Sequence, residues 1–247
     1  MNSNILLTGG TGKLGNSIIN SNLFNNLDAP KRSELDITSY NLVNKYFDDN
    51  KIDTVIHCAA LARLSICHNK PDLAIKTNII GTEYLVKKIK EIEYIRGDKI
   101  RFIYISTDGV YKSKRGNYSE EDKTEPNTIY GWTKLAAEYI VKRLSNHVII
   151  RTRFFDPDNI PFTKSAEDIF SSNIPLVKLI EAIKFITENQ FSGVINIGEK
   201  RLSDYERYKL YKPNIKPCSR EELANTVPFE LAYDASMDCS LWNDIST

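Results

Sequence analysis

The chain has 247 residues, enough for one large α/β domain and a small C-terminal lobe. Its 33 basic and 32 acidic residues leave a net charge of +1, so no strong field attracts nucleic acid or an anionic membrane. No apolar run approaches the ~18 residues that a membrane-spanning helix needs. We therefore expect neither a nucleic-acid partner nor a membrane partner.

The remaining composition predicts a cytoplasmic protein without a metal site. The N-terminus lacks a basic region followed by a long apolar core, so no signal peptide is expected. Four scattered cysteines form no Cys-x-x-Cys pair, which is typical of reduced thiols. The three histidines, at positions 57, 68 and 147, show no metal-ligand spacing.

A glycine-rich stretch stands between a predicted strand at 4–8 and a predicted helix at 16–24. In that position glycines indicate dinucleotide binding. Gly9 permits a tight turn, Gly12 lets the backbone approach a pyrophosphate at the helix N-terminus, and Gly15 allows the helix to pack closely on the strand. The predicted cofactor contacts here are Gly9, Thr11, Gly12, Lys13, Leu14 and Gly15.

The second strand, at 27–30, is poorly marked and is followed by Lys31 and Arg32. An NAD enzyme usually has an acid there to bind the ribose 2′-hydroxyl, whereas a guanidinium suits a 2′-phosphate. Arg32 therefore favours NADP(H), with NAD(H) as the alternative. A solvated basic pair in a loop explains the two residues equally well.

Further along, hydrophobic periodicity predicts alternating helices and strands. Ala59 and Ala60, at the end of the third strand, are small enough for a cofactor to lie against the backbone, although core packing also explains them. The expected helices are 39–50, 71–95, 130–144, 173–188 and 203–211. The expected strands are 54–60, 101–106, 148–151 and 191–197, with a surface loop at 117–127 and largely irregular chain after 213.

Tyr130 and Lys134 head the fourth predicted helix, at 130–144, as Tyr-x-x-x-Lys. Four residues apart, they share one helix face. An ammonium group beside a phenol favours the phenolate and lowers its pKa, so the pair could exchange a proton with a carbonyl or an alcohol. The motif alone is weak, because most such pairs are surface neighbours.

Several motifs together resemble known families. Thr-Gly-Gly-x-Gly-x-x-Gly at 8–15 resembles the sugar-nucleotide branch of the extended short-chain dehydrogenase/reductase superfamily. Ser-Thr-Asp-x-Val-Tyr at 106–111, an acidic loop and then Tyr-Gly-x-Thr-Lys-Leu-Ala-x-Glu at 130–138 are similar to dTDP-4-dehydrorhamnose reductases. The resemblance covers most of the chain and is most specific in 1–152.

The resemblance implies a Rossmann-type doubly wound parallel sheet. It divides the chain into an NAD(P)-binding core at 1–152 and a mixed region at 153–247 that completes the sheet and forms a small substrate lobe. Asp36 and Ile37 resemble the family pair at the adenine, and Asn78 resembles the asparagine that helps to hold the catalytic lysine through a water. All three are predicted to be cofactor-binding residues.

By the same resemblance, the activity is NADPH-dependent reduction of a nucleotide-linked 4-keto-6-deoxy sugar, in cell-surface polysaccharide biosynthesis. Tyr130 would protonate the alkoxide, Lys134 would bond the nicotinamide ribose, and Thr107 would orient the keto oxygen. Asp108 and Phe154 would lie near the sugar. A homodimer is compatible with the resemblance.

Two departures affect the interpretation. Related dTDP-glucose 4,6-dehydratases carry Asp-Glu after the threonine, but this chain has Asp108 followed by Gly109, which disfavours a dehydratase. Arg153 and Phe154 replace a frequent Ser-Trp pair, and the stretch 155–172 diverges, so the substrate stays open. The alternatives are a non-catalytic NADP-binding subunit, like the regulatory subunit of methionine adenosyltransferase, and a nucleotide-sugar epimerase.

Overall fold

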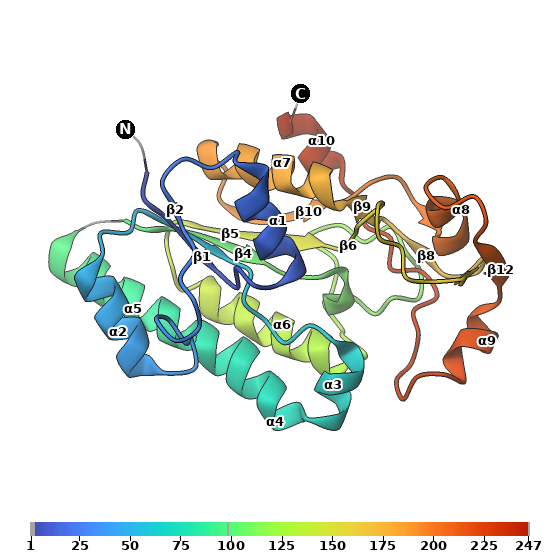
Figure 1. Ribbon diagram of the computed structural model, residues 1–247, viewed down its shortest axis with the longest axis horizontal. Coiled ribbons are helices and arrows are strands. Elements are labelled where there is room, and N and C mark those ends of the chain that lie inside the picture. Colours follow the sequence, from blue (N-terminus) through green and yellow to red (C-terminus); the bar gives the residue numbers. More distant parts are fainter. Residues whose placement is uncertain (1–2, 98, 247) are drawn as a thin grey trace.

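A parallel sheet of six strands runs through the centre of the computed structural model, which describes residues 3–97 and 99–246 (Figure 1). The strand order is β10-β5-β4-β3-β1-β2. This confirms the predicted Rossmann-type α/β fold. The strands are β1 (Ile5–Thr8), β2 (Leu27–Asp28), β3 (Thr54–His57), β4 (Arg101–Ile105), β5 (His147–Thr152) and β10 (Gly193–Ile197).

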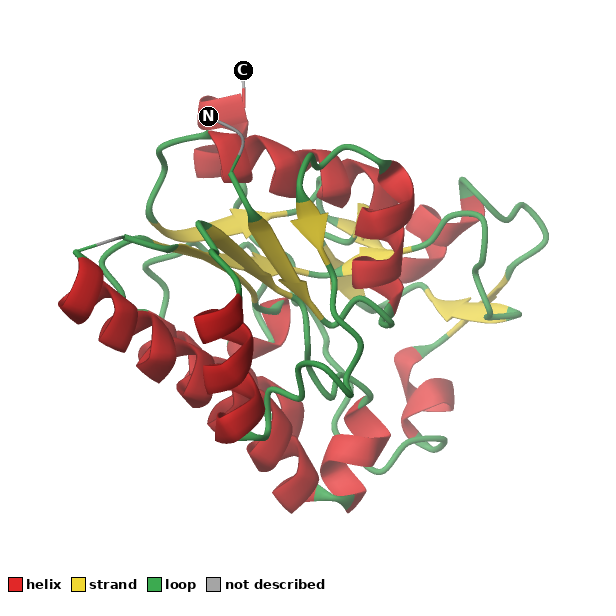
Figure 2. Cartoon of the chain, turned by 60° about the vertical axis from the view of Figure 1, so that its left-hand side comes forward, coloured by secondary structure: helices red, strands yellow, loops and turns green. Residues whose placement is uncertain are grey.

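Helices cover both faces of this sheet (Figures 1 and 2). Successive side chains of a strand point to opposite faces, so Ile5 and Leu7 join one apolar cluster and Leu6 joins the other. The central strands are buried on both sides and read as continuous apolar runs. One face packs against α1 (Lys13–Ser21), α7 (Leu176–Glu188) and α10 (Ser240–Ser246); the other packs against α2 (Tyr40–Asp49), α5 (Gly81–Arg96) and α6 (Ile129–Val141).

The predicted helix at 71–95 is three consecutive segments instead of one regular helix. It comprises α4 (Pro71–Ala74), the π-helical turn η1 (Ile75–Ile80) and α5. A π-helical turn widens the helix by one residue per turn and is often found at functional sites. Asn78 lies inside it. Helix α3 (Leu64–Asn69), which the sequence did not predict, precedes these segments.

The second half of the chain completes the sheet and adds short paired strands. β10, for which the periodicity predicted a strand at 191–197, pairs in parallel with β5 and forms one edge of the sheet. The short strands beyond β5 lie with α8 and α9 at one end of the molecule, on the right in Figure 1. They are β6 (Phe154–Phe155) with β9 (Ile174–Pro175), β7 (Lys164–Ala166) with β12 (Lys216–Cys218), and β8 (Phe170–Ser171) with β11 (Leu202–Ser203); the helices are α8 (Asp204–Lys209) and α9 (Arg220–Ala224).

The prediction of largely irregular chain after residue 213 therefore missed β12, α9 and α10, which are short elements without a clear period. The helix α9 is fixed by a capping box, in which Ser219 and Glu222 satisfy each other's backbone N–H groups. None of the helices in the described part of the chain is long and apolar enough to cross a membrane.

Candidate active site

Two adjoining cavities lie at the carboxyl ends of the central strands, where open α/β sheets bind ligands. Their volumes are about 440 and 240 Å³, and both are lined by Gly9, Gly12, Cys58 and Ala60. Of the residues predicted from sequence, the smaller cavity also has Thr11, Arg32, Asp36, Ile37 and Ala59, and the larger has Lys13, Leu14, Gly15, Thr107, Asp108, Tyr130, Lys134 and Phe154.

The glycine loop joins the two cavities through close backbone contacts. Gly9 has a φ of 79°, and a Cβ there would lie 2.6 Å from the Ala59 nitrogen. A Cβ on Gly15 would lie 2.2 Å from the Gly9 carbonyl oxygen. Helix α1 begins directly after Gly12, whose position has no side-chain cap. Its first N–H groups therefore suit an anionic group such as a dinucleotide pyrophosphate.

Arg32 and Asp36 stand at the smaller cavity. The Arg32 Nε donates to Asp36 Oδ2 at 2.9 Å, and Thr38 donates to Oδ1 through its backbone N–H at 2.9 Å and its hydroxyl at 2.8 Å. Partial burial opposes ionisation of Asp36, but the bonds from Thr38 and Arg32 outweigh it and lower the pKa of this carboxyl. Asp36 is thus an ionised carboxylate that orients Arg32.

Close packing of α6 on the turn after β4 brings Tyr130 and Thr107 to the larger cavity. A Cβ on Gly131 would lie 2.2 Å from the Gly109 carbonyl oxygen, so only glycine allows this approach. Thr128 caps the helix by accepting from the Gly131 N–H at 3.1 Å. Thr107 Oγ1 accepts from the Gly109 N–H at 3.1 Å and donates to Asp108 Oδ1 at 3.0 Å.

The pKa of Tyr130 shifts opposite to the sequence expectation. Burial raises it, and the Asp108 carboxylate raises it further, because both disfavour a phenolate. Burial also lowers the pKa of Lys134 to about 7, against the opposing effect of Glu138. A lysine with so low a pKa is only partly protonated near neutral pH, so it stabilises a phenolate less than the sequence argument assumed. Tyr130 is accordingly a neutral phenol, suited to donate a proton.

Arg153 is a cavity residue that the sequence did not assign to the site. Its guanidinium lies 3.8 Å from Asp108 Oδ2 and 4.0 Å from Asp204 Oδ2 of α8. Burial raises the pKa of the Asp108 carboxyl, and the positive charge of Arg153 opposes that shift. Asp108 Oδ2 is buried and accepts no hydrogen bond from the residues that the structure describes. The available signal was the position of Arg153 two residues after the predicted strand at 148–151.

Residues 229–232 and Ala235 also line the larger cavity, and nothing in their sequence pointed to the site. Asn78, by contrast, was predicted to bind the cofactor but lines neither cavity. Its side chain accepts from the Leu61 N–H at 2.7 Å and donates to the Leu61 carbonyl at 3.1 Å and to Thr133 Oγ1 at 2.9 Å. The π-helical turn therefore directs Asn78 toward a loop and α6.

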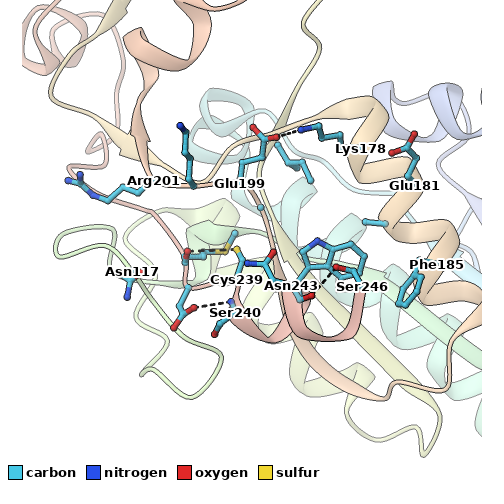
Figure 3. Close-up of a pocket in the computed structure, with 17 residues that line it drawn as sticks. Asn117, Lys178, Glu181, Phe185, Glu199, Arg201, Cys239, Ser240, Asn243 and Ser246 are labelled. Carbon is cyan, nitrogen blue, oxygen red and sulfur yellow. Dashed lines mark hydrogen bonds and ion pairs between the residues drawn. The ribbon is translucent and has the colours of Figure 1, made fainter.

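A third, more open groove of about 850 Å³ lies between α7, the segment 198–201 and α10 (Figure 3). Glu199 accepts from Lys178 at 2.5 Å in this groove, and Arg201 pairs with Asp234 at 2.6 Å. None of the sequence-predicted site residues lines it. Its charges are largely compensated, so the two cavities at the strand ends are the better candidate site.

Both the sequence and the fold are similar to those of known proteins. Residues 3–159 match the family model described as the RmlD substrate binding domain. Over 229 residues the chain is 26% identical to a dTDP-4-dehydrorhamnose reductase of Aggregatibacter actinomycetemcomitans, which covers 87% of this chain and 74% of that protein. Over 149 residues it is 32% identical to methionine adenosyltransferase 2 subunit beta of Bos taurus, which covers 57% of this chain and 43% of the relative.

The chain thus spans less than half the length of that bovine relative. Among solved structures, a dTDP-4-dehydrorhamnose reductase from Bacillus anthracis, in complex with NADP, superimposes with a TM-score of 0.87 at 23% identity, covering 99% of this chain and 93% of that one. That likeness shows the shared fold. Because the family model matches well over half of the chain, this protein belongs to the RmlD substrate binding domain family.

Proposed function

We propose that this chain is an NADPH-dependent reductase of a nucleotide-linked 4-keto-6-deoxy sugar. One observation carries the proposal: Thr107, Tyr130 and Lys134 line the same cavity as the glycine loop. The reductase relatives support the substrate class, and the NADP complex of the Bacillus anthracis reductase supports the cofactor. A bound NADPH would supply the hydride.

The residues of this chain would bind the cofactor and the sugar, and would supply the proton that the reduced carbonyl oxygen takes up. The first N–H groups of α1 would hold the pyrophosphate, and Arg32 would contact a 2′-phosphate at the smaller cavity. Tyr130, kept neutral by burial, would donate its proton to the developing alkoxide. Thr107 donates to Asp108, so it would turn its hydroxyl to the keto oxygen only by releasing that bond.

Residues 153–247 would provide the sugar-binding lobe. Arg153 and Phe154 enter the larger cavity from the end of β5, and residues 229–232 enter it from the C-terminal segment. Asp108 Oδ2 would accept a hydrogen bond from a sugar hydroxyl, because this buried oxygen has an ion pair with Arg153 but accepts no hydrogen bond from the described residues. The division into a core at 1–152 and this lobe is part of the proposal.

The test mixes the protein with NADPH and dTDP-4-dehydrorhamnose and follows the absorbance of the reduced nicotinamide. Tyr130→Phe should lower kcat by roughly 10²–10⁴-fold, as expected for loss of a positioned acid. Tyr139→Phe, which changes an exposed tyrosine of the same helix, is the matched control and should retain the wild-type rate. Undiminished turnover by Tyr130→Phe would remove Tyr130 from the proposed role.

A second candidate is a nucleotide-binding subunit without turnover. The 32% identity to methionine adenosyltransferase 2 subunit beta favours it, because a shared fold does not require a shared activity. Binding of NADPH without oxidation in the presence of keto sugars, together with co-purification of a methionine adenosyltransferase catalytic subunit, would support this candidate. The presence of Thr107, Tyr130 and Lys134 in one cavity supports the reductase.

A further inference from the structure

The Lys134 ammonium is buried beside the larger cavity, and its position needs an explanation. Lys134 is 2% exposed and lies on the face of α6 that is turned toward β4. Asn78, the residue expected to help to hold it, bonds Leu61 and Thr133 instead. Glu138, one turn further along α6, bonds Ser106 and Arg151. Both neighbouring polar side chains are therefore engaged elsewhere.

The aromatic ring of Tyr104 faces the ammonium directly. Lys134 Nζ lies 3.9 Å from the centroid of this ring, well within the range of a cation–π contact. Tyr104 is on β4, three residues before Thr107, and is 1% exposed. A desolvated ammonium gains more from a ring face than an exposed one does, because water no longer competes for it.

Packing on both the sheet and the helices fixes the Tyr104 ring, whereas its hydroxyl makes no hydrogen bond that would anchor it in the described part of the chain. The His57 ring packs against Tyr104 with centroids 5.6 Å apart, and Tyr104 belongs to the apolar cluster beneath α5 and α6. Its buried hydroxyl has no hydrogen-bond partner in the described part of the chain. A buried tyrosine normally has a partner for its hydroxyl, so the contact that Tyr104 offers at this site is its ring face.

We propose that Tyr104 is a positioning residue whose ring face holds the Lys134 ammonium at the cofactor cavity and stabilises its charged form. The contact is a property of this chain's own packing, and its catalytic consequence rests on the proposed function. Burial lowers the pKa of Lys134 to about 7, and the charges of Glu138 and Cys58 oppose this shift. On this proposal the ring face adds to that opposition. Without the ring, Lys134 would lose more of its charge at neutral pH and would no longer be fixed in place.

The experiment measures the pKa of Lys134 in the protein without cofactor, by NMR of labelled lysine side chains assigned with Lys134→Met. Tyr104→Phe keeps the ring and should leave that pKa within a few tenths of a unit. Tyr104→Leu removes it and should lower the acid dissociation pKa by about one unit, equivalent to a roughly tenfold change in proton affinity. The same two variants are compared for NADPH affinity by titration.

A graded series protects the test against a misfolded Tyr104→Leu protein. Singly, doubly and triply ring-fluorinated phenylalanine at position 104 keeps the shape but progressively weakens the negative face of the ring. The pKa of Lys134 should fall stepwise along this series. A pKa that stays constant across the series, or that falls equally in Tyr104→Phe and Tyr104→Leu, would overturn the proposal.

These measurements separate this inference from the proposed function. The pKa shift requires neither a sugar substrate nor turnover. A stepwise shift in a protein that reduces no keto sugar would support the contact and reject the reductase. Rapid reduction of a keto sugar by a protein whose Lys134 pKa stays constant across the fluorinated series would support the reductase and reject the contact. If both hold, the alkaline limb of the pH profile for kcat/KM, where Lys134 loses its proton, should also move to lower pH in Tyr104→Leu and not in Tyr104→Phe.

Discussion

His57 is a fully buried histidine whose two ring nitrogens are both bonded. Thr82 Oγ1 donates to the Asn78 carbonyl, so it accepts from His57 Nε2 at 3.0 Å. Thr8 Oγ1 then donates to His57 Nδ1 at 2.6 Å. This arrangement fits a neutral imidazole, because a second ring proton would displace the Thr8 hydroxyl. Burial, and then the charge of Lys134, lower the pKa of His57 to about 3.

This residue predicts a loss of stability in acid. The unfolded state binds a proton at His57 near pH 6.5, whereas the folded state does so only near pH 3, so the contribution is complete above about pH 6.5 and falls as the pH decreases. We expect a slope of up to about 1.4 kcal/mol per pH unit from this group. Urea unfolding of the wild type and of His57→Gln from neutral pH to about pH 5 should show a smaller slope in the variant. Equal slopes would contradict the assignment of a neutral, buried His57.

Helix α6 is the element on which the site depends most, and a buried ion pair fixes it to the sheet. Arg151 of β5 donates to Glu138 of α6 through Nη2 at 2.7 Å and through Nε at 3.1 Å. Ser106 Oγ also donates to Glu138, at 2.5 Å, and Arg151 Nη1 donates to the Tyr111 hydroxyl at 2.9 Å. The side chain of Glu138 is 1% exposed and that of Arg151 is 3% exposed. The network sets the register of Tyr130 and Lys134 relative to the strand ends.

Breaking this pair should be costly, since it leaves one charge buried without compensation. We expect Glu138→Leu or Arg151→Leu to lower the free energy of unfolding by about 3–5 kcal/mol. The double variant should be less destabilised than the two single changes together, because no lone charge remains. Urea unfolding near neutral pH measures all three. Lys112→Gln, in an exposed pair with Glu125, is the control and should leave the free energy of unfolding nearly unchanged, because water screens this pair. If Glu138→Leu and Arg151→Leu each lowered the free energy of unfolding as little as that control, a structural role for the pair would be ruled out.

At the scale of the whole molecule, the order of the strands creates the site. The chain runs outward from β1 to β2 on one side and through β3, β4, β5 and β10 on the other. Because the strand order reverses direction at β1 and β3, the loops that follow these two strands run to opposite sides and leave a crevice between them. Gly9 and Ala59 lie there and line the smaller cavity. The short paired strands and the C-terminal segment approach the same ends, so the larger cavity is bounded by residues more than 200 positions apart, from Gly9 to Ala235.

A ligand that spans both cavities should stabilise the whole fold. NADPH at about 100 times its Kd should raise the free energy of unfolding by about 2.7 kcal/mol.

If Arg32 binds the 2′-phosphate, NADH should bind more weakly, and Arg32→Ala should bring the two affinities together. Isothermal titration gives the Kd values and thermal unfolding gives the shifts in Tm. Lys31→Ala, which removes the neighbouring cation, is the matched control; an equal effect of both variants would indicate a nonspecific charge effect.

The sequence by itself determined the fold class and pointed to most of the residues that line the two cavities at the strand ends. Its information there is local: the glycine loop follows an apolar run, and Tyr130 and Lys134 share a helix face because of a fixed offset. Such patterns act over a few residues, so they can be seen without the fold. They also placed Thr107 directly after a predicted strand, and the family resemblance placed Phe154 near the sugar. The fold brings both residues to one cavity.

Only the tertiary structure decided the electrostatics and the long-range contacts. Burial reversed the expected pKa shift of Tyr130, and a π-helical turn directed Asn78 away from the cavities. Arg153 and residues 229–232 reached the site, and the Tyr104 ring met Lys134, through packing between distant segments. Desolvation and contact geometry depend on what surrounds a side chain in space, which no local spacing of residues specifies.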